Sequence, residues 1–238
     1  MFITFEGLDF SGKSTQATLL VEKLKQQHCT VHFIREPGGT AISEKIRDIL
    51  LDKKHLEMSD TAEILLFSAS RSQLVSQVIK PALLRGEVVV CDRYCDSTTA
   101  YQGYGRELDL DAVRAINKLA TGGTMPDLTV LVDIPIDEIE RRKTRAGLTF
   151  DRMESSGRAF YERVRDGYHQ LVLAEPERWV RVSGLLSIDE IQKEICSKVE
   201  NKIKRFATPE GPSEGMPSAE GLLRRMPSVK GTKSSRVH

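Results

Sequence analysis

The feature that most constrains the fold is the glycine-rich stretch at residues 7–14, which reads GLDFSGKS and matches the pattern GxxxxGK[ST]. It lies between a short apolar run at residues 2–5 and a helix-like stretch at residues 14–27. Glycines in this setting let the backbone turn tightly, so that its N–H groups and the helix N-terminus can hold phosphate. The stretch therefore predicts a strand, a phosphate-binding loop and a helix, in that order.

Further apolar or β-branched runs alternate with longer helical stretches along the rest of the chain. They occupy residues 31–34, 88–91, 128–132 and 179–182. Such alternation predicts an α/β fold in which a five-stranded parallel sheet is surrounded by helices, a three-layer sandwich of the P-loop NTPase type. Ser187 and Glu190 have the spacing of a capping box and predict the start of the last helix.

Composition limits the number of domains and the kind of partner. A chain of 238 residues with 39% hydrophobic content fits one α/β domain with a closed core. The formal net charge is +1, which gives no general attraction to nucleic acid. No apolar run approaches the ~20 residues of a membrane-spanning helix, and residues 1–6 do not resemble a leader, so we expect a cytoplasmic protein without membrane partners. Its four cysteines form no CxxC pair and are expected to be free thiols.

The character of the chain changes near residue 205. Prolines, glycines, serines and charged residues dominate from there on, with few apolar side chains to bury. We therefore expect a folded domain at residues 1–204 and a disordered tail at residues 205–238.

The predicted loop implies a nucleoside triphosphate and Mg²⁺ as cofactors, with Lys13 on the β- and γ-phosphates and the Ser14 hydroxyl on the metal. The candidate nucleotide-binding residues are Gly7, Leu8, Asp9, Phe10, Ser11, Gly12, Lys13, Ser14 and Thr15. The loop alone leaves GTPases, motor ATPases and small-molecule kinases open. The chain lacks an NKxD guanine motif and an LSGGQ transporter signature, which disfavours GTPases and transporters.

Candidate acceptor-binding residues follow two of the predicted strands, at the carboxyl ends where open α/β sheets bind ligands. Asp92 and Arg93 follow the third strand; Asp92 could order Mg²⁺ through water, and Arg93 could hold an acceptor phosphate by paired hydrogen bonds. A structural ion pair is the alternative. Glu36 follows the second strand, before a Pro-Gly-Gly turn, and is an acid beside the expected polyphosphate site.

Phe67 and Arg71 lie four residues apart on a predicted helix and therefore project from one face. An aromatic ring beside a guanidinium group suits a nucleobase. Burial of Phe67 in the core is the alternative reading.

Five separate motifs together resemble bacterial thymidylate kinases. They are GLDFSGKST at residues 7–15, EPGGT at 36–40, LLFSASRSQ at 65–73, DRY at 92–94 and STTAYQGYGR at 97–106. The resemblance covers residues 1 to about 204. It implies an ATP-dependent enzyme that phosphorylates dTMP to dTDP for dTTP biosynthesis, with Mg²⁺ as cofactor and a homodimer as the assembly.

The resemblance also implies roles for single residues. Asp9 would contact the sugar 3′-hydroxyl, Phe67 would stack on thymine, Arg71 would donate to its O4 atom, and Arg93 would hold the dTMP phosphate. Glu36 would organise the acceptor phosphate and metal. Lining the base and sugar pocket are Ser97, Tyr101 and Gln102, with Tyr101 disfavouring a ribose 2′-hydroxyl.

The arginine-rich stretch at about residues 141–154 resembles the lid of the family. Phe10 stands where some members carry a catalytic arginine in the P-loop, so the lid would supply that charge, with Arg145 and Arg152 as the candidates. Arg141 and Arg142 could equally be solvated surface. The expected catalytic set is Lys13, Glu36, Asp92, Arg93, Arg145 and Arg152, with Ser14 and Asp92 at the metal.

Two alternatives stay open from the sequence. The first is a kinase for another nucleoside monophosphate or for a deoxynucleoside. The second is a nucleotide-binding regulator that has lost turnover.

Overall fold

The computed structural model describes residues 1–146, 152 and 157–207 and contains a single parallel sheet within those residues. Its order is β2-β3-β1-β4-β5, with every neighbouring pair parallel. The strands are β1 (Phe2–Glu6), β2 (Val31–Arg35), β3 (Val88–Asp92), β4 (Leu128–Asp133) and β5 (Trp179–Ser183). The expected five-stranded parallel sheet is confirmed, and each predicted run lies within a strand.

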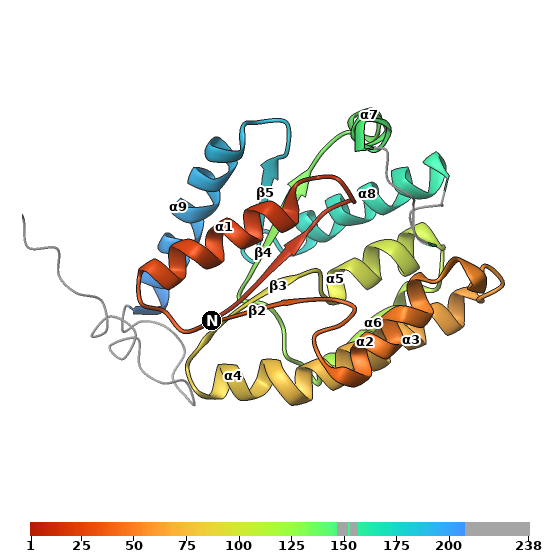
Figure 1. Ribbon diagram of the computed structural model, residues 1–238, viewed down its shortest axis with the longest axis horizontal. Helices are drawn as coiled ribbons and strands as arrows, with labels where there is room; N and C mark the ends of the chain where they lie inside the picture. Colours follow the sequence, from red (N-terminus) through yellow and green to blue (C-terminus); the bar gives the residue numbers. More distant parts are fainter. Residues whose placement is uncertain (147–151, 153–156, 208–238) are drawn as a thin grey trace, which may run out of the picture.

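Helices cover both faces of the sheet (Figure 1). On one face lie α1 (Lys13–Gln26) and α9 (Ile188–Ala207). The other elements include α7 (Ile136–Ala146) at the carboxyl end of the sheet. The remainder are α2 (Ala41–Leu51), the 3₁₀-helix η1 (Lys53–His55), α3 (Asp60–Leu74), the π-helix η2 (Val75–Ile79), α4 (Lys80–Leu84), α5 (Cys95–Thr98), the π-helix η3 (Thr99–Gly105), α6 (Leu110–Thr121) and α8 (Arg158–Ala174).

The core is divided by the sheet. Ile3, Phe5 and Val130 pack with apolar residues of α1 and α9 on one side. On the other side, Phe2 and Val89 pack with α3 and η2, while aromatic residues of α8 and η3 form a third cluster. The central strands β1, β3 and β4 are thus buried, as the middle of a parallel sheet requires, whereas the edge strand β2 is only partly buried.

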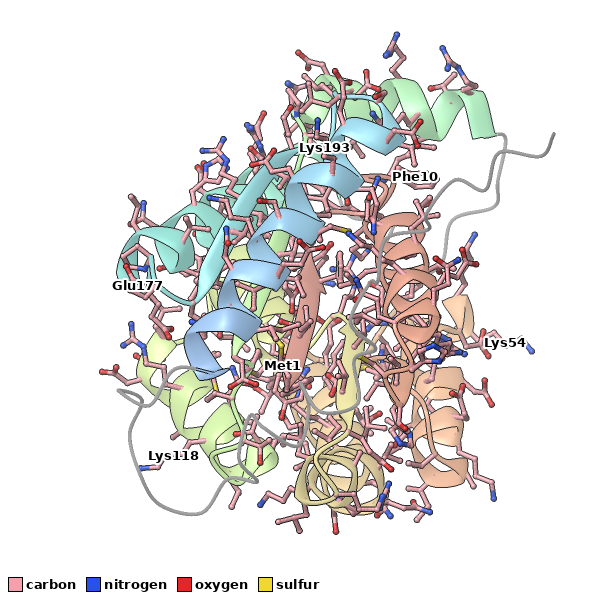
Figure 2. The ribbon with its side chains drawn as sticks, turned by 90° about the vertical axis from the view of Figure 1, so that its left-hand side faces the viewer. Met1, Phe10, Lys54, Lys118, Glu177 and Lys193 are labelled. Carbon is pink, nitrogen blue, oxygen red and sulfur yellow. The ribbon has the colours of Figure 1, made fainter. Side chains whose placement is uncertain are left out.

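The carboxyl ends of the strands meet at one edge of the sheet and bring distant sequence motifs together. Phe5 and Arg35 are both in register with Asp92, so the segments that follow β1, β2 and β3 begin side by side. Figure 2 shows Met1 and Phe10, which lie before and after β1, at different heights in the molecule. The P-loop, Glu36 and Arg93 therefore converge at this edge.

The last helix begins as predicted. Glu190 accepts from the backbone N–H of Ser187 at 2.9 Å, and Ser187 Oγ accepts from the N–H of Glu190 at 3.3 Å. The helix continues to Ala207, beyond the boundary expected at residue 204, and the rest of the predicted tail lies outside the described residues. In the described part of the chain, no helix is long and apolar enough to cross a membrane.

Candidate active site

The loop between β1 and α1 forms an anion site built from backbone. Gly12 caps α1 in a left-handed conformation (φ 95°) and, having no side chain, leaves the first N–H groups of the helix to a ligand. Gly7 has a φ of 138°, and a Cβ atom there would lie 2.5 Å from the carbonyl oxygen of Val132. Only glycine fits that approach. The geometry is that expected of a loop that holds nucleotide phosphates.

Ser14 and Asp92 form a donor pair suited to a hard cation. Ser14 Oγ donates to Asp92 Oδ2, while Asp92 Oδ1 is buried and has no hydrogen-bond partner among the residues described. In the same residues there is no group of three or more His, Cys, Asp or Glu that could hold a metal. One hydroxyl and one carboxylate fit Mg²⁺, which takes its other ligands from water and phosphate oxygens.

Asp9 lies between two cations. Its Oδ1 atom is 3.6 Å from Lys13 Nζ and 2.6 Å from an Arg93 nitrogen. Burial by itself would raise the pKa of Asp9, but the charges of Arg93 and Lys13 hold that pKa well below its usual value. Asp9 is therefore ionised and draws the two cations toward the same place.

Arg93 is oriented by a shell of oxygen atoms. Its NH1 group donates to Gly7 O at 3.0 Å, to Ser97 Oγ at 3.2 Å and to Tyr168 OH at 3.4 Å. Its NH2 group donates to Tyr101 OH at 3.1 Å, and the guanidinium lies 4.9 Å from the Tyr101 ring centre. The described residues supply no acceptor for its Nε–H, which leaves that donor for a ligand.

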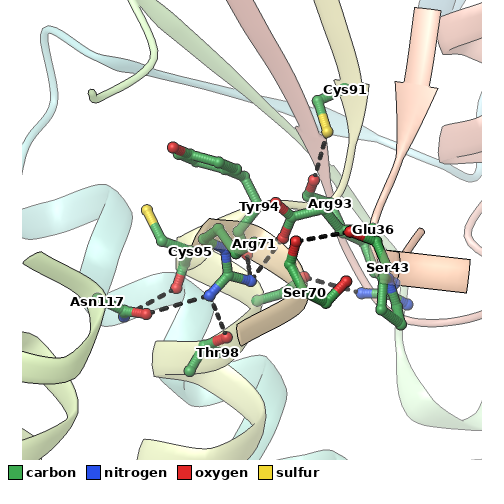
Figure 3. Close-up of polar contacts among 12 residues, drawn as sticks. Glu36, Ser43, Ser70, Arg71, Cys91, Arg93, Tyr94, Cys95, Thr98 and Asn117 are labelled. Carbon is green, nitrogen blue, oxygen red and sulfur yellow. Dashed lines mark hydrogen bonds and ion pairs between the residues drawn. The ribbon is translucent and has the colours of Figure 1, made fainter. Parts of the chain in front are cut away.

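Arg71 is the centre of a buried polar cluster (Figure 3). Only 1% of the residue is exposed. Its Nε donates to Glu36 at 2.8 Å and its NH2 to the carbonyl of Tyr94 at 3.1 Å, while NH1 donates to Thr98 at 2.9 Å and to Asn117 at 3.3 Å. A hydrogen bond from Arg71 to a thymine O4 atom, as expected from the resemblance, would have to share or replace one of these contacts.

Glu36 uses one oxygen for Arg71 and keeps the other unpaired. Oε2 lies 2.6 Å from an Arg71 nitrogen, whereas Oε1 is buried without a partner in the described part of the chain. Burial raises the pKa of Glu36 against the opposing effect of the Arg71 charge. In the described residues Oε1 faces no protein donor, and Glu36 lines a cavity. Oε1 is therefore an acceptor that a ligand or water could use.

A cavity of about 290 Å³ unites the two sets of residues. Its lining includes every predicted substrate-binding residue, together with the predicted Lys13, Ser14 and Asp92. These substrate-binding residues are Asp9, Glu36, Phe67, Arg71, Arg93, Ser97, Tyr101 and Gln102. Donor-side and acceptor-side candidates therefore share one space.

Gln102 presents its amide to the cavity in a defined orientation. Its Nε2 donates to Glu63 Oε1 at 2.9 Å, and Glu63 is fully buried in α3. Glu63 also accepts from Arg106 at 3.2 Å. Since an ionised carboxylate only accepts, the Gln102 carbonyl must turn away from Glu63.

Several lining residues were not predicted. Arg35 ends β2, so the strand-end rule that selected Glu36 could also have selected it. Arg47, on α2, lines the cavity because α2 packs against α3, which no sequence spacing reveals. Arg35 and Arg47 both donate to the carbonyl of Pro37, at 3.3 and 2.9 Å. Thr98 and Leu51 also line the cavity.

The arginines of α7 behave differently from one another. Arg141 is exposed and pairs with Glu138, as a surface residue would. Arg142 also pairs with Glu138, at 2.6 Å, and in addition donates to the carbonyl of Phe10 at 2.9 Å and to that of Gly184 at 2.8 Å. The alternative that Arg142 is mere solvated surface is therefore wrong, because it ties α7 to the P-loop.

The two lid candidates lie in contrasting places, and most of the predicted lid falls outside the described residues. Arg145 is exposed near the end of α7. Arg152 is buried; it lies 2.6 Å from Glu63 Oε2 and donates to the carbonyl of Leu50 at 2.7 Å. Neither belongs to the cavity lining in this structure.

Comparison with known proteins agrees with this geometry. A profile of the family described as thymidylate kinase matches residues 5–195. The chain is 50% identical to a thymidylate kinase of an Exiguobacterium species over 196 residues, which is 82% of this chain and 92% of the relative. It is 46% identical to a thymidylate kinase of a Roseiflexus species over 211 residues, 84% of this chain and 93% of the relative.

A solved structure is similar as well. The crystal structure of thymidylate kinase from Ehrlichia chaffeensis superposes with a TM-score of 0.69 and 34% sequence identity. The match covers 84% of this chain and 98% of that one. The likeness thus extends over the sheet and the helices around it.

Proposed function

The chain belongs to the thymidylate kinase family, and we propose that it transfers the γ-phosphoryl group of ATP to dTMP, giving dTDP and ADP. A phosphate oxygen of dTMP attacks the γ-phosphorus directly, and no covalent enzyme intermediate is needed. Because the acceptor phosphate is already ionised near neutral pH, catalysis depends on positioning and charge stabilisation more than on a strong base.

One observation carries the proposal: the P-loop residues and the acceptor residues line a single cavity. Lys13 and Arg93 meet there across the shared carboxylate of Asp9. Two negatively charged phosphate groups that must approach each other need cations of this kind between them. The arrangement supports transfer between two phosphates better than hydrolysis of one nucleotide.

On the donor side, the P-loop backbone and Lys13 bind the β- and γ-phosphates. Ser14 and Asp92 would hold Mg²⁺, with the unpaired Asp92 Oδ1 as a further acceptor for metal-bound water. When bound, the cation neutralises phosphate charge. Exposed Arg145 or the now buried Arg152 would add positive charge from the lid.

On the acceptor side, Arg93 binds the dTMP phosphate and Asp9 contacts the 3′-hydroxyl. Phe67 stacks on the base, whereas Ser97, Tyr101 and Gln102 line the sugar and base. Glu36 would help to organise the acceptor phosphate and the metal, and Arg71 both holds Glu36 and donates to the base O4. A pyrimidine with an N3–H suits the Gln102 carbonyl, and cytosine does not.

The remaining parts of the proposal concern the assembly and the cell. A homodimer is supported by exposed apolar residues on α2 and α3, where Ile42 is 54%, Ile49 44% and Leu65 52% exposed in the single chain. Analytical ultracentrifugation of the purified protein tests this assembly. We also propose a cytoplasmic location and a kinase domain that extends to the end of α9 at Ala207.

The deciding experiment is an ADP-release assay with MgATP and, in turn, dTMP, dUMP, dCMP and thymidine. We expect the highest kcat/KM with dTMP and no sustained ADP release without an acceptor. Arg93→Ala should lose most activity, and Arg85→Ala, which changes an exposed arginine, should lose none. A preference for another acceptor would indicate a different kinase, and silence with all four would indicate a non-catalytic regulator.

A further inference from the structure

Glu6 is a buried acid to which the mechanism above gives no task. It is the last residue of β1, directly before the P-loop, and it is fully buried. An ionisable group in such a place needs hydrogen-bond donors around it. The identity of those donors indicates what Glu6 does.

Three donors surround the Glu6 carboxylate. The backbone N–H of Tyr94 donates to Oε1 at 2.8 Å. The hydroxyl of Ser97 donates to Oε2 at 2.5 Å, and the hydroxyl of Tyr168 donates to the same oxygen at 2.9 Å. Glu6 thus joins β1, α5 and α8 just behind the cavity.

The same two hydroxyls also contact Arg93. Arg93 NH1 lies 3.2 Å from Ser97 Oγ and 3.4 Å from Tyr168 OH. A hydroxyl has one hydrogen to donate and two lone pairs with which to accept. When both hydrogens point to Glu6, both oxygens present lone pairs to Arg93.

We infer that Glu6 is a positioning residue, which orients the Ser97 and Tyr168 hydroxyls so that they hold the Arg93 guanidinium in place for the acceptor phosphate. This inference rests on the proposed role of Arg93. An acceptor-only carboxylate sets the direction of the whole chain of hydrogen bonds from Arg93 through the hydroxyls to Glu6. A side chain at position 6 that donates a hydrogen bond would reverse the hydroxyls, so that their hydrogens point toward Arg93 and no longer toward position 6.

The charges around Glu6 act on its pKa in opposite directions. Burial and the nearby Asp96 carboxylate raise the pKa of Glu6 to about 7, while the hydrogen bonds from Ser97 and Tyr168 and the charge of Arg93 act against that rise. Glu6 is therefore mainly the acceptor-only carboxylate above pH 7, and the variants are compared at about pH 8. Loss of any one member weakens the others.

Glu6→Gln tests the inference because it keeps the shape and changes the direction of the hydrogen bonds. With its oxygen held by the Tyr94 N–H, the amide nitrogen faces both hydroxyls and donates to them. We expect the KM for dTMP to rise about tenfold, with the KM for ATP changed less than about twofold. Asp133→Asn, which alters a buried carboxylate paired with other arginines, serves as the control and should leave both KM values unchanged.

A second comparison separates positioning from stability. In a Ser97→Ala, Tyr168→Phe background the intermediary hydroxyls are absent, so adding Glu6→Gln should no longer raise the KM for dTMP. If Glu6→Gln does not fold, Tyr168→Phe alone carries the test and should raise the KM for dTMP about threefold.

Two results would overturn the inference: an equal rise in both KM values, or an effect of Glu6→Gln that persists without the hydroxyls. For Tyr168→Phe used alone, an unchanged KM for dTMP does the same. Turnover of dTMP by the unaltered protein is measured first. Its absence would contradict the proposed function, whereas an active protein with an unaffected Glu6→Gln variant would contradict only the role of Glu6.

Discussion

The donor end of the cavity offers backbone N–H groups, whereas the acceptor end offers side chains that are already bonded to one another. The donor end is the part of the cavity formed by the P-loop. There Gly7 and Gly12 shape a loop that directs the N–H groups of the helix N-terminus to where an anion would bind. The acceptor end is the part formed by Arg71, Arg93 and the residues around them. There Arg71 and Arg93 each donate hydrogen bonds to several oxygen atoms of the protein itself.

The coupling between stability and catalysis should therefore differ between the two ends of the cavity. Lys13 beside the backbone cradle is buried and pairs with Asp9 at 3.6 Å, but Asp9 keeps a closer partner in Arg93 at 2.6 Å. Changing this lysine should therefore affect ligand binding more than folding. The acceptor end is different, because its cations also compensate buried carboxylates. Substitutions there should affect folding as well as activity.

The largest expected effect is on catalysis at the donor end. Lys13→Ala should lower kcat/KM for dTMP about 10³-fold, since it would remove the cation proposed to bind the transferred phosphate. The free energy of unfolding should change by less than about 1 kcal/mol, because Asp9 keeps its closer ion pair with Arg93 at 2.6 Å when the 3.6 Å pair with Lys13 is lost.

Steady-state kinetics and urea denaturation measure the two quantities. Lys25→Ala, an exposed lysine of the same helix, is the control. If Lys13→Ala lowered the free energy of unfolding by about as much as Arg71→Leu does, the two ends of the cavity would not differ in this respect, and the prediction would be wrong.

The next effect is on stability at the acceptor end. Arg71→Leu should lower the free energy of unfolding by about 3 kcal/mol, because it leaves Glu36 as a buried charge without a partner. Adding Glu36→Gln should restore part of that loss, since the unpaired charge is then gone. Urea denaturation of the single and double variants measures both. Equal stability of Arg71→Leu and the native protein would contradict the prediction.

A third effect concerns the pH dependence of stability at the end of β4, which lies beside the P-loop. Asp133, at the end of β4, pairs with Arg165 at 2.8 Å and with Arg181 at 2.6 Å. Burial would raise the pKa of Asp133, but hydrogen bonds from these arginines, with the nearby His169, lower it to about 2. Because the folded-state pKa is depressed, the ionised carboxylate stabilises the protein above the unfolded-state pKa, and this is lost as pH falls toward 2.

Asp133→Asn should therefore cost about 2 kcal/mol of unfolding free energy at pH 7, and progressively less below pH 4. Denaturation at several pH values measures this, with Asp111→Asn, an exposed acid, as the control. A cost that is independent of pH would show that packing, and not charge, accounts for it.

The smallest effect is on base choice. Glu63→Gln should raise the ratio of kcat/KM for dCMP to that for dTMP about tenfold, because a neighbouring amide lets Gln102 turn either way. The effect should vanish in a Gln102→Ala background. Glu57→Gln, on the surface, is the control. An unchanged ratio would mean that Glu63 does not orient the base-reading amide.

Local patterns in the sequence were enough for the sheet and the P-loop. Each apolar run became a strand; β1, β3 and β4 are buried as the middle strands of a parallel sheet, and the edge strand β2 is only partly buried. The glycines at positions 7 and 12 specify left-handed backbone that few other residues adopt. The residues after β2 and β3 could be placed near the P-loop, since parallel strands end at one edge.

The contacts of the predicted side chains could not be obtained in this way. Tyr168 and Glu6 are 162 positions apart, yet their side chains bond. Arg142 reaches the Phe10 carbonyl from 132 positions away, although its local sequence looks like a solvated basic run. Glu63, which orients Gln102, carries no motif of its own.

Short sequence patterns were enough for the fold class and the phosphate loop, because both depend on backbone preference and on periodicity within short segments. The acceptor-side residues were assigned their roles from the resemblance to a family, and these roles stay predictions. Tertiary structure alone decided which donors face which acceptors. Whether Arg71 and Arg93 are free or already bonded depends on how α3, α5, η3 and α8 pack around the sheet. Such packing brings together residues far apart in the chain, and no local pattern encodes it.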